Sequence, residues 1–220
     1  MNKVDFDTIE ETIKTSGVAK LIADQKMDCY PLVVSGVPDL WQADFCSHGF
    51  AIYAQYHDYW IDNLAPSASE YGEFDFLNED ECGIASEISI ACRGQSRGFE
   101  GEPPEWFGEW LKDENLHNAA VLVNRANNRI VGISCTATYA HDSEKGAVAW
   151  VRMLAVHPDF QRRGIGKKLL IQTLKYGANH GAKRAFLHAD AENFAAIRIY
   201  SNAGFVSCGG IGQIDMILKQ

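Results

Sequence analysis

The stretch VRMLAVHPDFQRRGIGKKLL, residues 151–170, predicts a strand, a glycine-rich turn and the start of a helix. Its apolar first part stops at Pro158, and apolar residues return at helical spacing from Leu169 onward. Glycine has no Cβ to keep a ligand away from the backbone, and the first turn of a helix leaves amide groups without intrahelical partners. Aligned peptide dipoles add partial positive charge there. The stretch therefore predicts a phosphate or pyrophosphate site, to which Arg162 and Arg163 add full charges.

Two common phosphate motifs do not fit this turn. A P-loop needs a glycine where the chain has Gln161 and a serine or threonine where it has Lys168, and the dinucleotide fingerprint needs a glycine at Leu169. The string from Leu154 to Gly166 instead closely resembles the coenzyme A pyrophosphate loop of the GNAT N-acetyltransferase superfamily. The resemblance implies acetyl-CoA as cosubstrate, with the strand backbone meeting the oxyanion and the pantetheine arm. The cofactor-binding residues that it implies here are Leu154, Ala155, Val156, Gln161, Arg162, Arg163, Gly164, Ile165, Gly166 and Lys167.

A second motif follows downstream. Residues 183–189 predict a buried strand, and residues 193–205, NFAAIRIYSNAGF, predict a helix with Asn193 as its N-cap and Gly204 after its end. The segment resembles the family's second cofactor-contacting segment, which implies that Asn193 contacts the cofactor and that Tyr200 lies near its sulfur. The reference pKa of tyrosine, ~10, lies above that of a thiol, ~8.5, so Tyr200 would stay protonated at neutral pH and could donate a proton to the departing thiolate. Without the resemblance, Tyr200 would be interpreted as a core residue.

The general base departs from a common pattern. Many relatives carry a glutamate on the strand before the loop, where this chain has Arg152, which cannot accept a proton. Strand alternation predicts Trp150, Arg152 and Leu154 on one face, so that Arg152 would orient an acidic group of the acceptor. A salt bridge to a neighbouring Glu or Asp explains Arg152 equally well. The candidate substrate-binding residues are Arg152, Trp150 and Glu105, and the candidate bases are Glu105, Glu109, His188 or a chain of water molecules.

Composition narrows the class of protein. With 220 residues, 46% of them hydrophobic, the chain can bury the core of one large domain or of a domain with an extension. No run approaches the ~20 apolar residues of a membrane span, and the acidic start MNKVDFDTIEE is unlike a signal peptide, so we expect a cytoplasmic protein without a membrane partner. The net charge of −9 argues against nucleic acid and suits a cationic acceptor. Cysteine and histidine spacings predict neither a disulfide framework nor a metal site.

The first third of the chain lies outside the resemblance. Residues 1–30 predict a weakly amphipathic helix and residues 29–34 a short strand. We therefore expect residues 1–70 to form a mainly helical extension packed on the core. A further helix is predicted by an aromatic stripe, which is more often core packing but is also a candidate wall of an acceptor pocket: Ile52, Tyr53, Tyr56, Trp60 and Leu64.

From residue 71 the chain alternates strands and helices. Residues 71–77 predict a strand, Asn78 and Glu81 a capping box that opens a helix, and Pro103-Pro104 the start of another helix. Between these helices lies the glycine-rich loop 94–102. In the resembling family this helix–loop–helix borders the acceptor, which implies that the loop determines specificity.

The remaining predicted strands complete a sheet. Residues 119–124 and 130–140 predict a hairpin that turns through Asn127-Asn128, and residues 206–208 and 214–218 predict two final strands. The resemblance implies an α/β mixed architecture over residues 71–220, the GNAT acyl-CoA N-acyltransferase fold, with a largely antiparallel central sheet and helices on both faces. The exposed last strand permits a homodimer.

The function follows as a hypothesis. The resemblance predicts an N-acetyltransferase that moves the acetyl group of acetyl-CoA to a primary amine of a small molecule or peptide by direct attack. The alternatives are a non-catalytic CoA-binding regulatory or interaction module, and an acyltransferase with another acyl donor or an oxygen acceptor. Asn193 and Tyr200 favour an enzyme over a mere binder.

Overall fold

The computed structural model of the chain describes residues 18–22, 39–47, 49–64 and 73–218. These residues divide into two compact units. The smaller unit comprises the described residues within 1–58, 188–192 and 208–220, and the larger unit comprises those within 59–187 and 193–207.

The described strands are β1 (Val18–Ile22), β2 (Phe50–Ile61), β3 (His117–Ala126), β4 (Arg129–Tyr139), β5 (Ala147–Val156), β6 (Ala182–Asp190) and β7 (Val206–Leu218). Their hydrogen-bonded order is β1-β7-β2-β6-β5-β4-β3. In the larger unit, β3, β4 and β5 pair antiparallel and β6 pairs parallel to β5. The expected mixed, largely antiparallel sheet is confirmed.

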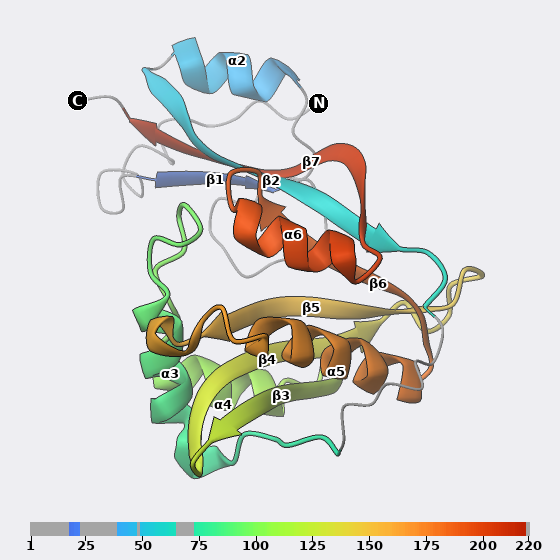
Figure 1. Ribbon diagram of the computed structural model, residues 1–220. Coiled ribbons are helices and arrows are strands. Elements are labelled where there is room, and N and C mark those ends of the chain that lie inside the picture. Colours follow the sequence, from blue (N-terminus) through green and yellow to red (C-terminus); the bar gives the residue numbers. More distant parts are fainter. Residues whose placement is uncertain (1–17, 23–38, 48, 65–72, 219–220) are drawn as a thin grey trace. The chain divides into compact units, whose positions relative to one another are not determined.

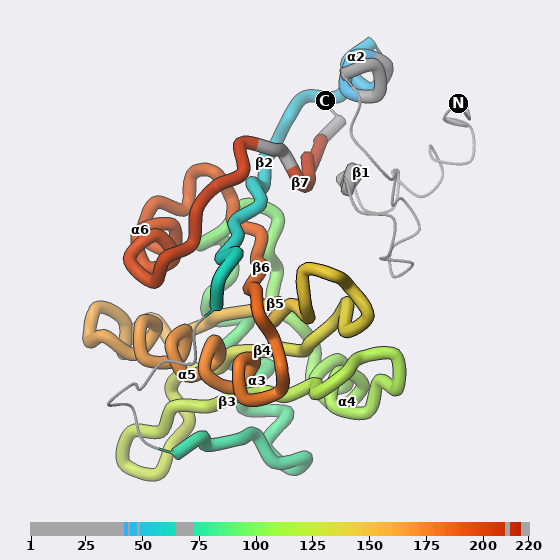
Figure 2. Tube along the Cα trace, turned by 90° about the vertical axis from the view of Figure 1, so that its right-hand side faces the viewer, coloured from blue at the N-terminus to red at the C-terminus, as the bar shows by residue number. Residues whose placement is uncertain are grey.

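The larger unit carries helices on both faces of this part of the sheet. Helices α3 (Cys82–Ala91) and α4 (Pro104–Lys112) lie on one face of β3, β4 and β5, and α5 (Ile165–Asn179) lies on the other (Figures 1 and 2). Helix α6 (Phe194–Asn202) follows β6. Proline at the first position of α4 suits its start, because proline has no N–H to leave unpaired there.

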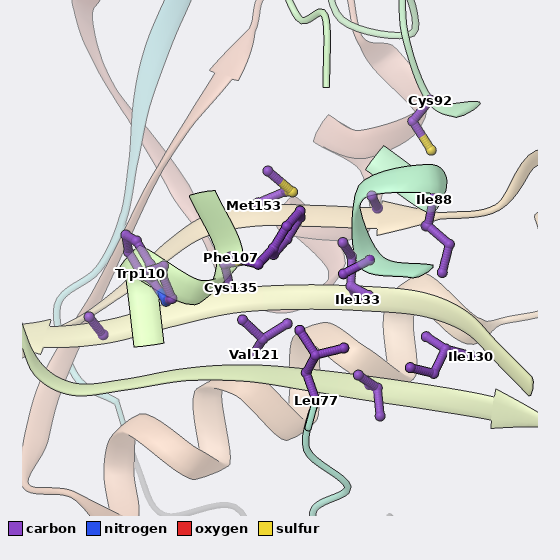
Figure 3. Close-up of a cluster of buried hydrophobic side chains, with 14 residues drawn as sticks. Leu77, Ile88, Cys92, Phe107, Trp110, Val121, Ile130, Ile133, Cys135 and Met153 are labelled. Atoms are coloured by element: carbon purple, nitrogen blue, oxygen red, sulfur yellow. The ribbon is translucent and has the colours of Figure 1, made fainter. Parts of the chain in front are cut away.

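A hydrophobic core lies between the sheet and helices α3 and α4 (Figure 3). Phe107 of α4 and Ile133 of β4 are completely buried, and Ala85 of α3 packs in the same cluster. Burying a large apolar side chain contributes ~1.5–3 kcal/mol, so this cluster is a main source of stability for the unit. It also fixes both helices on the sheet.

Helix α5 packs on the opposite face. Leu169 and Leu170 are fully buried, as the spacing of apolar residues predicts. Gly177 lies directly against Ala149 of β5, because a Cβ on Gly177 would overlap the Ala149 methyl group. The absence of that atom lets the helix approach the strand that ends in the predicted phosphate site.

The predicted capping box is confirmed. The Asn78 N–H donates to Glu81 Oε2 at 3.0 Å, at the start of a single 3₁₀ turn (Glu79–Glu81) that leads into α3. The predicted β3–β4 turn is confirmed as well, since Asn127 and Asn128 have φ angles of 50° and 62°.

The smaller unit contains β1, most of β2, most of β7 and helix α2 (Asp39–Ser47). β1 pairs antiparallel with β7, with Leu21 opposite Ile214. Asp58 of β2 accepts a hydrogen bond from His188 Nδ1 at 2.7 Å, and a Cβ on Gly212 of β7 would overlap the Asp58 carboxylate. Glycine is therefore required for this close approach.

Two helix predictions are wrong. Residues 18–22 form β1 instead of part of an amphipathic helix, and residues 50–61 form β2. The spacing of Ile52, Tyr56 and Trp60 fits one face of a helix, but a spacing of four also fits one face of a strand, whose period is two. The β-branched and aromatic content of β2 favours the strand.

Two strand predictions are corrected. Residues 73–77 form one isolated bridge, Phe76 to Leu122, instead of a strand. The two predicted final strands are a single strand, β7, in which Gly209 has a φ of 73°. Its glycines mark a bend and a close approach and do not end the strand.

The rest of the helix predicted over residues 1–30 and the strand predicted over residues 29–34 lie outside the described residues, and the boundary at residue 70 stays a prediction. Within the described ranges, every helix falls short of the length and apolarity that a membrane crossing requires.

Candidate active site

The phosphate loop, residues 161–166, joins β5 to α5. After β5 the chain makes a 3₁₀ turn (Pro158–Phe160), and α5 begins at Ile165 with Gly164 as its N-cap. Gly164 has a φ of 81°, a left-handed conformation that favours glycine, and a Cβ built there would have no protein atom within 4 Å. The space beside Gly164 can therefore admit a phosphate group.

Six successive amides of this segment are available as donors. The Gln161 N–H donates to Pro158 O at 3.2 Å and the Lys168 N–H donates to Gly164 O at 3.0 Å. Between them, the amides of residues 162–167 have no acceptor within the described part of the chain. These N–H groups surround the positive end of a 15-residue helix, an arrangement that suits a diphosphate.

The two loop arginines are held differently. Arg163 Nη2 donates to Asp159 O at 2.8 Å, and its guanidinium lies 5.1 Å from the centre of the Phe160 ring. Arg162 is exposed, has a φ of 59°, and has no partner for its guanidinium among the described residues. Arg162 is therefore the more available of the two positive charges.

The Gln161 side chain connects three segments. Its Nε2 donates to Val156 O at 2.9 Å and to Gln95 Oε1 at 2.9 Å. Cys92 Sγ, at the end of α3, donates to the same Val156 carbonyl at 3.2 Å. The phosphate loop is thereby tied to the end of β5 and to the glycine-rich loop 94–102.

β5 has a neighbouring strand on both sides over only the first part of its length. β5 pairs with β6 only as far as Trp150 and Phe186, whereas its pairing with β4 continues to Val156. In the larger unit, the backbone at Leu154 and Ala155 therefore has a strand on one side only. This edge is where the resemblance places the acyl group and the pantetheine arm.

A β-bulge at Arg152 corrects the predicted faces of β5. Cys135 pairs with Met153 and Thr136 pairs with Val151, so Arg152 is the extra residue. Trp150 packs with the α3–α4 core, but Leu154 packs with Leu169 under α5. The prediction that Trp150, Arg152 and Leu154 share a face is wrong for Leu154, because the extra residue reverses the alternation.

Arg152 forms an ion pair with a residue that the sequence did not single out. Its Nη2 lies 3.5 Å from Glu102 Oε1, and its guanidinium lies 5.6 Å from the centre of the Trp106 ring. The salt bridge considered from the sequence is thus present. Glu102 ends the glycine-rich loop just before Pro103-Pro104. This position beside the loop is the only feature of the sequence that could have pointed to a role for Glu102.

Helix α6 carries the second predicted motif. Asn193 caps it, since Asn193 Oδ1 accepts from the Ala196 N–H at 3.2 Å. Tyr200 is buried beside Phe205, and burial raises the pKa of Tyr200 to about 12. Tyr200 therefore stays protonated at neutral pH and can donate a proton.

Two of the candidate bases lie one turn apart on α4, and the third belongs to the smaller unit. Glu105 and Glu109 of α4 are exposed, and His188 pairs with Asp58 in the smaller unit. In the residues that the structure describes, no group of three or more His, Cys, Asp or Glu side chains is arranged to hold a metal ion.

Comparison with known proteins agrees with this geometry. Residues 86–205, more than half of the 220, match the acetyltransferase (GNAT) family. The chain belongs to the GNAT family. The matched range of this GNAT protein contains the phosphate loop, Arg152, Asn193 and Tyr200.

Curated relatives of the GNAT chain match part of their length. An uncharacterized N-acetyltransferase of Methanocaldococcus jannaschii is 32% identical over 103 residues, 46% of this chain and 44% of that protein. A mycothiol acetyltransferase of Acidimicrobium ferrooxidans is 33% identical over 119 residues, 50% of this chain and 37% of that protein. The matches thus span less than half the length of these relatives.

Solved structures share the fold. A GCN5-related N-acetyltransferase from Sphaerobacter thermophilus is similar with a TM-score of 0.61 and 16% identity, over 96% of this chain and 64% of that one. Another from Kribbella flavida has a TM-score of 0.59 and 15% identity, over 98% of this chain and 74% of that one. The predicted GNAT fold is confirmed.

Proposed function

We propose that this protein is an acetyl-CoA-dependent N-acetyltransferase whose acceptor is a primary amine of a small molecule or peptide. The observation that carries the proposal is the run of six amides at residues 162–167 without protein acceptors, beside the left-handed Gly164. Three of these amides belong to the first turn of α5, which leaves N–H groups without intrahelical acceptors, and the loop before it adds three more at the same helix end. The family membership of residues 86–205 supports the same conclusion.

The cofactor would be held mainly by main-chain groups. The amides of residues 162–167 would bind the diphosphate, with Arg162 and Lys167 as exposed positive charges nearby. Asn193 keeps its amide N–H₂ group for a ligand, because its cap uses the oxygen. Gln161 would act from the side of β5, where it already contacts the Val156 carbonyl.

The acyl group would lie along the part of β5 after Trp150, where the strand pairs with β4 but not with β6. Leu154, Ala155 and Val156 offer backbone polar groups on that edge, beyond the last residue of β5 that pairs with β6. A backbone N–H there can stabilise the negative carbonyl oxygen that forms as the amine attacks. The Val156 carbonyl already accepts two hydrogen bonds, so a ligand reaching it would share it with Gln161 or displace that side chain.

Tyr200 would supply the proton for the leaving group. The amine nitrogen forms a bond to the carbonyl carbon, the carbon–sulfur bond breaks, and the sulfur takes the Tyr200 phenol proton. The proton released by the amine restores the phenol through solvent. Since the pKa of Tyr200 is raised to about 12, the phenol is fully protonated at neutral pH. A thiolate, with a reference pKa of ~8.5, is less basic than this phenolate, so the transfer would be completed only as the phenolate regains the proton that the amine releases.

The test is thiol release. Purified protein is mixed with acetyl-CoA and a panel of primary amines, and free thiol is followed with a chromogenic disulfide. The proposal expects amine-dependent release, and CoA binding in the absence of amine by calorimetry. Binding without release for any amine would point to a CoA-binding module, and failure to bind CoA would overturn the proposal altogether.

A further inference from the structure

The Arg152 guanidinium has few hydrogen-bond partners among the described residues. It sits at the β5 bulge, and its side chain is 23% exposed. Its one polar contact in the described part of the chain is to Glu102, from one nitrogen to one oxygen at 3.5 Å. A guanidinium carries five N–H donors, so most of the donor capacity of Arg152 is not used by the described residues.

Arg125 shows how the same protein satisfies a structural arginine. Its side chain is 25% exposed, nearly the same as that of Arg152. Arg125 nevertheless donates to Glu81 at 2.6 and 2.9 Å and to Asp75 at 3.0 Å. At equal exposure, one arginine is saturated by two carboxylates and the other has one long contact.

Glu102 fixes the position of Arg152 and is itself fixed. The Glu102 N–H donates to Ser89 Oγ at 2.9 Å, and Ser86 Oγ donates to Glu102 O at 2.7 Å. Both serines are buried on α3. The Glu102 carboxylate therefore starts from a rigid backbone and can hold Arg152 in place.

Three indole rings lie on the same side of β5 as Arg152. Trp106 is stacked on Trp110 with ring centres 5.4 Å apart, and Trp110 meets the edge of Trp150 at 5.6 Å. Arg152 lies over Trp106. Trp110 is buried in the core, but Trp106 and Trp150 are only partly buried. A cation with this aromatic surface beside it suits a ligand with an acidic group and an apolar body.

We propose that Arg152 binds a carboxylate of the acceptor, so that the substrate class is an amine that also carries a carboxylate, as an amino acid does. Glu102 is then a positioning residue that holds the guanidinium ready. The Glu102 carboxylate lies beside the guanidinium and repels a doubly charged phosphate more strongly than a singly charged carboxylate, so the inference names the carboxylate. This inference rests on the proposed N-acetyltransferase function and names its substrate class.

The experiment compares acceptors that differ only in the acid. Wild-type protein and Arg152→Gln are assayed by thiol release with phenylalanine, phenylalaninamide and phenethylamine, and with β-alanine beside 2-aminoethyl phosphate. We expect kcat/KM for the carboxylates to exceed that of the uncharged amines by about tenfold or more in the wild type, as a charge-assisted hydrogen bond requires. Arg152→Gln should reduce this ratio to about one, and Arg152→Lys should restore part of it.

Arg125→Gln is the matched control, because it removes a guanidinium of equal exposure away from β5. It should lower stability and leave the carboxylate preference intact. Glu102→Gln should raise KM for carboxylate acceptors while CoA affinity stays unchanged. Equal rates for phenylalanine and its amide, a preference that survives Arg152→Gln, or a stronger preference for the phosphate would each overturn the inference and leave the N-acetyltransferase proposal standing.

A second readout does not need turnover. N-acetylphenylalanine and its amide are titrated by calorimetry into protein saturated with CoA. Tighter binding of the acid, lost in Arg152→Gln, supports the inference even if no tested amine releases thiol. Failure of the acid to bind better than the amide overturns it. Loss of CoA binding itself would instead count against the proposed function.

Discussion

Ile199 of α6 lies beside Gly166 of α5, so near that a Cβ added to Gly166 would lie 3.5 Å from Ile199 Cδ1. That distance is ordinary van der Waals contact. The contact attaches the helix that carries Tyr200 to the start of the helix that follows the phosphate loop. Two motifs separated in the sequence are thereby brought together within one unit.

Gly164→Ala should weaken CoA binding more than it weakens the fold. Alanine at a φ of 81° carries strain of about 1 kcal/mol, and its methyl group would enter the open space beside the free amides. Gly181→Ala is the matched control, because Gly181 also has positive φ, 89°, and open space, but lies after the other end of α5. Calorimetry with CoA and thermal denaturation should show similar stability losses and a binding loss for Gly164→Ala alone. Equal CoA affinities in the two variants would contradict the assigned diphosphate position.

Tyr200→Phe should lower kcat by about 100-fold and leave CoA affinity unchanged, because the phenol acts on the leaving group and not in binding. The measurement is steady-state thiol release beside CoA calorimetry. Undiminished turnover would remove Tyr200 from the mechanism.

The raised pKa of Tyr200 also predicts a pH dependence of stability. In the unfolded chain tyrosine ionises near pH ~10, and in the folded protein Tyr200 ionises at about 12. The contribution of neutral Tyr200 to the free energy of unfolding is therefore complete below pH ~10 and is lost as pH rises through about 12. Urea denaturation at pH 8 and 11 should show a smaller alkaline loss in Tyr200→Phe than in the wild type. An identical loss would exclude this titration.

The Glu81–Arg125 pair should stabilise the protein only above acidic pH. Hydrogen bonding to Arg125 is the main reason that the pKa of Glu81 falls to about 2, below the ordinary value. The contribution of ionised Glu81 to the free energy of unfolding is present above pH ~4.3 and is lost as pH falls through about 2. Glu81→Gln should cost about 2 kcal/mol at pH 7 and much less near pH ~2. A constant difference across this range in urea denaturation would rule out the ion pair as the cause.

Gln161→Leu should loosen the glycine-rich loop. Gln161 joins Gln95 to the Val156 carbonyl, and leucine of similar size cannot donate to either. Hydrogen exchange of amides 94–102, followed by mass spectrometry, should become faster, with Gln95→Leu as the companion variant that breaks only one of the two bonds. Unchanged exchange in both variants would show that the loop is held by other contacts.

Gly212→Ala should destabilise the smaller unit by about 2 kcal/mol, since the added methyl group would overlap the Asp58 carboxylate. A double-mutant cycle with Asp58→Ala separates this overlap from any general effect of alanine on β7. We expect the penalty to shrink when Asp58 is absent. Additive effects in thermal denaturation would instead assign the loss to the strand backbone.

The sequence alone determined the features that depend on local backbone requirements. The left-handed Gly204 after α6, the caps at Asn193 and Asn78, and the asparagine turn between β3 and β4 are present as predicted. Each requires a particular residue at a particular φ or hydrogen-bonding position, so neighbouring residues suffice to predict it. The strand–turn–helix around residues 161–166 belongs to this group, and so does the family; phosphate binding by this loop stays a prediction.

Only the tertiary structure decided the faces and partners. The four-residue spacing in β2 fits helix and strand alike, and pairing within the sheet selects the strand. One extra residue at Arg152 reverses the alternation of β5 and separates Leu154 from Trp150. Glu102 reaches Arg152 from 50 positions away in the chain, because two serines of α3 hold its backbone. Such contacts depend on distant residues meeting in a packed core, and no local pattern records which of them will meet.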